Sequence, residues 1–196
     1  ITRSGQFGDG AYLIVSGPAE QVIGHGAGAQ KQPVEPESDF MVYFTDSEVR
    51  RSGSMTEAQK RKRERLEQKY GRPDPKAVLK DVTHLLEVVA GGQKQLTVLS
   101  DEHQAYPRAI RQLRCQVTHL FTSSKERRDA RNRLFPVNLA DRLLRHSSAN
   151  HKRETIAWSK RRQGSAERLA VFLVWRNYMK GRKEKVRGSP TPAQVR

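Results

Sequence analysis

The sequence predicts an α/β domain, with a mixed sheet covered by helices on both faces. Strand-like segments come first in the chain, strand and helix patterns alternate in the middle, and helical patterns fill the last third. This order is typical of a sheet that buries both faces under helices. The 196 residues suffice for one domain with its own core.

Three strands are expected in the first 45 residues. Residues 11–15 are apolar and β-branched, and residues 21–23 are a weaker candidate. Residues 39–45 are the strongest candidate, because they are aromatic, β-branched and almost continuously apolar. Continuous apolarity favours a strand that is covered on both faces.

Residues 56–70 are expected to form an exposed basic helix inserted after the third strand. Thr56 is the expected N-cap, and Gly71 and Pro73 end the helix. Its cationic run has almost no apolar face. A solvated helix held by pairs of opposite charge and a DNA-contacting helix both remain open.

The middle of the chain alternates helix and strand. A helix beginning near Pro75 and ending at Gly91 carries apolar residues at steps of three and four, typical of one core-facing stripe. Residues 96–99 are a buried strand that ends at Asp101. A short helix over residues 104–113 and a strand over residues 116–121 follow.

Helices are expected over residues 138–145 and 150–180, with disorder from residue 181 on. The ribonuclease H-like arrangement fits this order, since it has three antiparallel strands, then helix–strand–helix–strand and a terminal helix. We therefore expect a ribonuclease H-like domain over residues 38–180 and a disordered basic tail over 181–196, with residues 1–37 supplying the first strands of the sheet at best.

The charge predicts a polyanionic partner. Lysine and arginine number 37 against 21 acidic residues, a net charge of +16, and residues 121–196 hold 20 basic side chains against 6 acidic ones. Nucleic acid is the commonest partner of such a field, because neutralised phosphates release condensed counterions. A basic solvated tail without a specific partner remains open.

Several classes of protein are not expected. No run approaches the length of apolar sequence that spans a membrane, and no signal peptide opens the chain. Cys115 is the only cysteine, so an intrachain disulfide and a cysteine-based zinc cluster are excluded. We expect a cytoplasmic protein, and Ile1 suggests a true start further upstream.

Two acidic residues are candidates for phosphodiester chemistry. This chemistry commonly uses two divalent ions about 4 Å apart, held by carboxylates. Asp101 directly follows a buried strand, although an aspartate in this position more often forms a turn or caps a helix. Glu154 shares one helical face with Asn150, Trp158 and Arg161. An ordinary surface glutamate is the alternative.

Several sequence blocks together resemble a group of bacterial insertion-sequence transposases. These blocks are residues 39–53, 70–76, 100–108, 134–155, 159–163 and 174–178. The resemblance covers about residues 38–180, and it is more specific than scattered acidic residues.

The resemblance implies a DDE transposase with a ribonuclease H-like fold and two Mg²⁺ ions, with Mn²⁺ as a substitute. Asp101 then matches the second catalytic acid and Glu154 the third. Residues 175–178 match a C-terminal signature assigned to packing and backbone contacts. The expected partners are transposon ends and target DNA, with assembly of several copies on DNA left open. The expected DNA-binding residues are Asn150, Lys152, Arg153, Lys160, Arg161 and Arg162.

The first acid is expected on the first strand. Residues 1–37 depart from the family pattern, and the resemblance therefore implies an atypical or damaged N-terminal segment there. Asp9 lies at about the expected place and is our candidate. Asp39 and Asp46 are rivals by residue type. Two alternatives remain for the whole chain, a DNA-binding remnant without catalysis and a basic RNA-associated structural protein. His103 and His119 are read as a loop polar group and a strand-face residue rather than as metal ligands.

Overall fold

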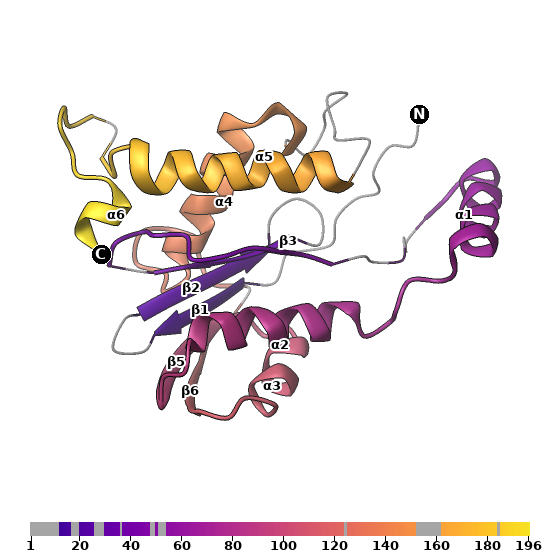
Figure 1. Cartoon of the computed structure of the whole chain (residues 1–196), viewed down its shortest axis with the longest axis horizontal. Coiled ribbons are helices and arrows are strands. Elements are labelled where there is room, and N and C mark those ends of the chain that lie inside the picture. The colour runs from indigo at the N-terminus through magenta and orange to yellow at the C-terminus, as the bar shows by residue number, and fades with distance from the viewer. Residues whose placement is uncertain are drawn as a thin grey trace.

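The computed structural model describes residues 12–16, 20–25, 30–35, 37–47, 50, 54–123, 125–151, 162–183 and 185–196. It has one mixed sheet between two helical layers (Figure 1). Helices α2 (Ala77–Ala90) and α3 (Ala105–Ile110) cover one face, and α4 (Phe135–Ser147) and α5 (Arg162–Val174) cover the other. This confirms the predicted mixed α/β class.

The sheet has six strands in the order β4-β3-β2-β1-β5-β6. Strands β1 (Tyr12–Ser16), β2 (Glu20–His25) and β3 (Gln30–Val34) form an antiparallel meander, and the two-residue β4 (Thr45–Asp46) pairs with β3. Strands β5 (Gln95–Ser100) and β6 (Gln116–Phe121) are parallel to each other. Strand β1 pairs antiparallel with β5, so the start of β1 lies beside the end of β5.

The third strand is not the predicted one. Residues 39–44 contribute only an isolated bridge between Met41 and Val34, and β3 supplies the third strand instead. Asp39 has a φ of 59°, and the N–H of Glu35 donates to the carbonyl of Phe40, which closes a tight loop. Phe40 and Met41 are nevertheless buried. Their apolar character therefore reflects burial in a loop rather than pairing in a sheet.

The predicted helix ends are largely confirmed. Helix α1 (Glu57–Tyr70) begins after a capping box in which the Thr56 side chain accepts from the Gln59 N–H. Helix α2 ends at Gly91, which adopts a φ of 51° and donates its N–H to the carbonyl of Glu87. Strands β5 and β6 lie where the alternation predicts them.

Two apolar clusters hold the helices onto the sheet. The first joins α2 and α3 to β5 through Leu96 and Val98. The second joins α4 and α5 to Leu99 of the same strand. Successive residues of β5 thus enter opposite clusters, as the pleat requires. Strand β5 is therefore anchored on both faces.

The C-terminal residues pack on the domain, in contrast to the predicted disorder. A π-helical turn η2 (Trp175–Met179) follows α5, and a short helix α6 (Pro192–Val195) ends the chain beside it (Figure 1). Arg182 Nε lies 3.0 Å from Asp39 Oδ2, and the Arg196 guanidinium lies 4.5 Å from the centre of the Phe40 ring. Composition suggested a solvated tail, but these contacts bind it to the loop at residues 35–41.

Candidate catalytic site

Asp101 lies at the carboxyl end of β5 with only 5% of its surface exposed. Ser100, just before it, is fully buried. A buried carboxylate is costly unless hydrogen bonds or charges compensate it. Its place directly after a strand anchored on both faces is the one predicted from the sequence.

One oxygen of Asp101 starts the turn into α3. The His103 N–H donates to Asp101 Oδ1 at 3.1 Å, and the Ala105 N–H donates to His103 Nδ1 at 3.2 Å. This is an Asx turn that leads into the helix. The structure therefore gives Asp101 the turn-forming role that is common for an aspartate after a strand, and His103 is a loop polar group as predicted.

A hydrogen-bonded link connects the end of β5 with β6. Ser100 Oγ donates to the Asp101 carbonyl at 2.7 Å and lies 2.7 Å from His119 Nε2. Because the Ser100 hydroxyl donates its hydrogen to the carbonyl, Ser100 Oγ acts as the acceptor for His119. The hydrogen bond therefore requires the tautomer of His119 that carries its hydrogen on Nε2. Burial lowers the pKa of His119 from 6.5 to about 4, so its imidazole is neutral at pH 7. The sequence identified His119 as a strand-face residue but gave no sign of this link.

The other two predicted acids lie outside the described residues. Asp9 comes three residues before Tyr12, the first residue of β1, and Leu13 stands opposite Ser100 in the antiparallel pairing. Glu154 comes three residues after His151, the last residue of the short helix η1 (Ala149–His151), which contacts α4. The nearest described residue is therefore three positions along the chain from each acid.

The predicted DNA-binding residues are described only in part. Lys152, Arg153, Lys160 and Arg161 lie outside the described residues. Asn150 belongs to η1 and Arg162 is the first residue of α5, and only the backbone of these two is described. Within the described ranges, no three His, Cys, Asp or Glu side chains form a group suited to a metal ion.

Residues 175–178 pack against the loop at residues 35–41. Arg176 and Asn177 are each only 2% exposed, and Arg176 Nη2 lies 3.8 Å from Asp39 Oδ2. The Phe40 and Tyr178 rings meet edge to face, with centroids 5.9 Å apart. The role in packing expected for this segment is thus observed. Asp39, a rival for the first catalytic acid, is instead engaged by Arg176 and Arg182.

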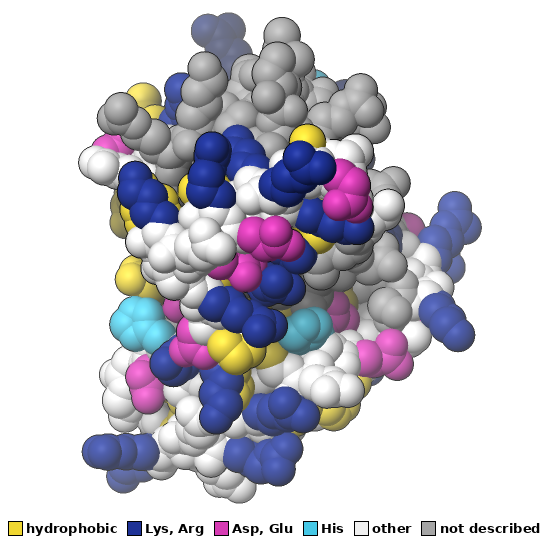
Figure 2. Space-filling view, turned by 90° about the vertical axis from the view of Figure 1, so that its right-hand side faces the viewer, with side chains coloured by type: hydrophobic (Ala, Val, Ile, Leu, Met, Phe, Trp, Pro, Cys, Tyr) yellow, Lys and Arg dark blue, Asp and Glu magenta, His cyan; other side chains and the backbone are white. Residues whose placement is uncertain are grey.

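Basic side chains are numerous on the face of the molecule that Figure 2 shows. Figure 2 shows many Lys and Arg side chains, with fewer acidic ones among them, on the side of the molecule from which α1 projects. Such a field attracts polyanions. Among the helices that the structure describes, none combines the length and apolar character needed to cross a bilayer.

No family model, curated protein or solved structure matches the chain.

Proposed function

We propose that the chain is the catalytic domain of a DDE-type DNA transposase, which cleaves transposon ends and joins them to target DNA with divalent metal ions. The observation that carries the proposal is the place of Asp101, a buried carboxylate at the end of strand β5, which is packed on both faces, inside the block that resembles these enzymes. The ribonuclease H-like fold is part of the same proposal, supported by the three antiparallel strands followed by helix–strand–helix–strand.

The pairing of β1 with β5 favours Asp9 as a partner of Asp101. Because the two strands are antiparallel, β1 begins where β5 ends. An extended chain spans at most about 3.6 Å per residue, so the Cα of Asp9 lies within roughly 11 Å of the Cα of Tyr12. This short connection to the start of β1 is the ground on which we propose Asp9 as the partner of Asp101.

The alternation of β5 favours Glu154 as the other partner. Leu99 packs in the cluster formed with α4 and α5, and Asp101 follows it by two residues. If the alternation continues one residue past the strand, Asp101 lies on this same face of the sheet. Glu154 belongs to the segment between η1 and α5, which starts and ends in the layer covering that face.

The carboxylates Asp9, Asp101 and Glu154 would hold the ions, since hard divalent cations prefer oxygen ligands. A pair of such ions activates the attacking oxygen and stabilises the leaving oxygen of an in-line displacement at phosphorus. Asp101 fits this role because it is an anchored carboxylate whose Oδ1 accepts the His103 N–H. The turn holds its side chain in a fixed orientation, which a ligand needs.

A DNA-binding remnant without catalysis is the second candidate. The observation that favours it is the Asx turn, because a structural role alone would account for Asp101. The two candidates differ in one property, divalent-metal-dependent breakage of DNA.

The proposal is tested by nicking of supercoiled plasmid DNA in Mg²⁺ or Mn²⁺. Asp101→Asn is a suitable variant, because the amide oxygen still accepts the His103 N–H and preserves the turn. We expect Asp101→Asn and Glu154→Gln each to lower the nicking rate by at least about 100-fold, since even outer partners of metal ligands matter 10- to 100-fold.

Glu102→Gln is the matched control, because Glu102 is an exposed acid adjacent to Asp101. It should retain the wild-type nicking rate. Metal-dependent nicking that survives Asp101→Asn and Glu154→Gln would contradict the assignment of these acids. No nicking by the folded wild-type chain would leave the DNA-binding remnant.

A further inference from the structure

We infer that α1 carries a binding surface for the phosphate backbone of duplex DNA, separate from the candidate catalytic site. The surface, called here the basic face, consists of four cations on one side of this helix: Arg61, Lys62, Arg65 and Lys69. The choice of DNA among polyanions rests on the proposed function, whereas the surface itself rests on the geometry and charge of α1.

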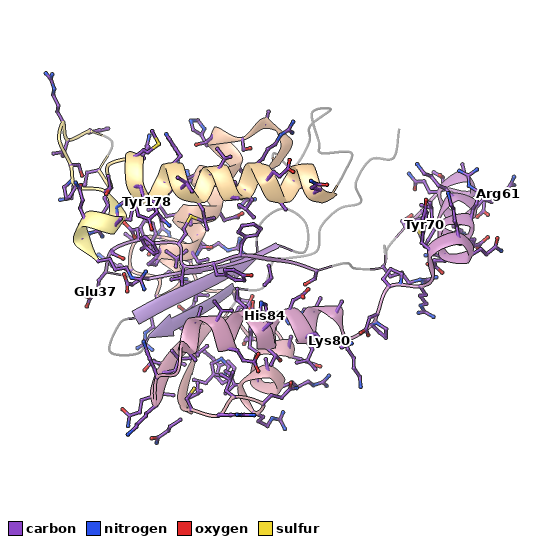
Figure 3. All side chains as sticks on the ribbon, viewed as in Figure 1. Glu37, Arg61, Tyr70, Lys80, His84 and Tyr178 are labelled. Atoms are coloured by element: carbon purple, nitrogen blue, oxygen red, sulfur yellow. The ribbon has the colours of Figure 1, made fainter. Side chains whose placement is uncertain are left out.

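Helix α1 projects from the rest of the domain and buries none of its residues (Figure 1). Arg61 points away from the domain at the tip of this projection (Figure 3). The helix is held locally, by its capping box and by the pairs Lys60–Glu57 and Arg50–Glu67, each 2.7 Å long. Its outer surface is therefore accessible to a partner as large as a nucleic-acid duplex.

The charges of α1 are segregated around its axis. Each residue advances about 100° in an α-helix, which puts the basic face in an arc of roughly 100°. The acids Glu57, Glu64 and Glu67 lie outside this arc, on the side of Lys60 and Arg63. Glu57 forms an ion pair with Lys60, and Glu67 forms ion pairs with Arg63 and Arg50. In the part of the chain that the structure describes, the basic face forms no ion pair.

Arg65 shows why a merely solvated helix does not account for this pattern. Its neighbours on the helix surface include Arg61 at i−4, Lys62 at i−3 and Lys69 at i+4, all of the same charge. Like charges at these spacings destabilise a helix, whereas opposite charges stabilise it. A helix kept only for solubility gains nothing from this cluster. A polyanion bound to it would relieve the repulsion.

The dimensions of the basic face fit duplex DNA. Arg61, Arg65 and Lys69 follow one another at steps of four residues, or about 6 Å along the helix. Lys62 lies at the far edge of the arc from Arg61, so the two can reach opposite walls of a groove. The major groove of B-DNA is about 12 Å wide and admits an α-helix, whereas the major groove of duplex RNA is narrow and deep.

The experiment measures binding of the full chain to a fluorescent 30-base-pair DNA of arbitrary sequence, over a range of salt concentrations in EDTA. The test variant is Arg61→Gln with Arg65→Gln, and glutamine is a good helix former. The slope of log K against log salt is negative, and each lost phosphate contact should reduce its magnitude by about 0.9, so we expect a decrease in magnitude of about 1.8.

The matched control is Lys60→Gln with Arg63→Gln, which removes the same charge from the other side of α1. We expect it to change the slope by less than about 0.5, with the helix content of all variants compared by circular dichroism. Equal effects of the two double variants, or no effect of the test variant, would overturn the inference. So would an effect on duplex RNA of the same sequence without one on DNA.

The outcome is separate from that of the proposed function, because EDTA removes the divalent ions that catalysis requires. A chain that fails to nick DNA but shows the predicted decrease would retain the basic face and lose only the catalytic proposal.

Discussion

The side-chain amide of Asn177 pairs with both backbone polar groups of Met41. The Met41 N–H donates to Asn177 Oδ1 at 2.9 Å, and Asn177 Nδ2 donates to the Met41 carbonyl at 2.8 Å. The amide thus makes the two backbone hydrogen bonds that a neighbouring strand would make in a sheet. Met41 lies in the segment that the sequence predicts as a strand and the structure shows as a loop. This contact joins residues 136 positions apart and fixes η2 to the sheet layer.

Replacing Asn177 by alanine should lower the free energy of unfolding by about 2–6 kcal/mol. The substitution leaves two buried backbone groups of Met41 without their partners, and each such group costs roughly 1–3 kcal/mol. Urea denaturation measures the change. Ala170→Ser, at an exposed position of α5, is the control and should change the free energy by less than about 0.5 kcal/mol. Equal effects of the two substitutions would contradict the role of Asn177.

Two glycine substitutions should have opposite effects. A Cβ on Gly181 would lie 2.7 Å from the backbone oxygen of Ser189. Gly181→Ala should therefore separate residue 181 from Ser189 and make the C-terminal residues more accessible to trypsin. A Cβ on Gly164 meets no atom within 4 Å, and alanine favours the helix. Gly164→Ala should therefore stabilise the protein by about 0.5–1 kcal/mol. Unchanged tryptic cleavage of the tail in Gly181→Ala would contradict the packed arrangement of these residues.

The stability of the protein should decrease as the pH falls from 6.5 towards 4, partly through His119. The pKa of this group is about 4 in the folded chain and 6.5 in its ordinary state. In that interval the unfolded state binds the proton and the folded state does not, so acid favours unfolding. Above pH 6.5 the neutral imidazole imposes no such cost.

Comparing urea denaturation at pH 7 and pH 4.5 checks this prediction. His119→Gln should reduce the difference in stability between the two pH values. His146→Gln, which removes an exposed histidine of α4, should leave the difference at its wild-type size. A pH dependence unaltered by His119→Gln would show that burial of this imidazole does not contribute.

The sequence predicted well those elements that local patterns determine. The stripe of α2 and its end at Gly91 were readable because helical spacing and a left-handed cap are local features. Asp101 was located because it directly follows the apolar run of β5. The misassigned residues 39–44 show the limit, since apolarity indicates burial but not the hydrogen-bonding partner. The backbone of Met41 is hydrogen-bonded by the side chain of Asn177, which is 136 residues away in the sequence.

The packing of the C-terminal residues could not be predicted from composition. Prolines and charges over residues 181–196 indicate disorder when read alone. The pairing of Arg182 with Asp39 and the stacking of Arg196 on Phe40 depend on a loop more than 140 residues away. The link between Ser100 and His119 was likewise hidden, because it requires the register of β5 against β6.

Calorimetric titration of the full chain with Mg²⁺ or Mn²⁺ tests the central claim most directly. We predict binding to the wild-type chain and to Glu102→Gln, and its loss in Asp9→Asn, Asp101→Asn and Glu154→Gln. That result would support one site assembled from three carboxylates. Absence of binding by the folded wild-type chain, or binding that survives all three substitutions, would contradict the proposal that the chain is a metal-dependent transposase domain.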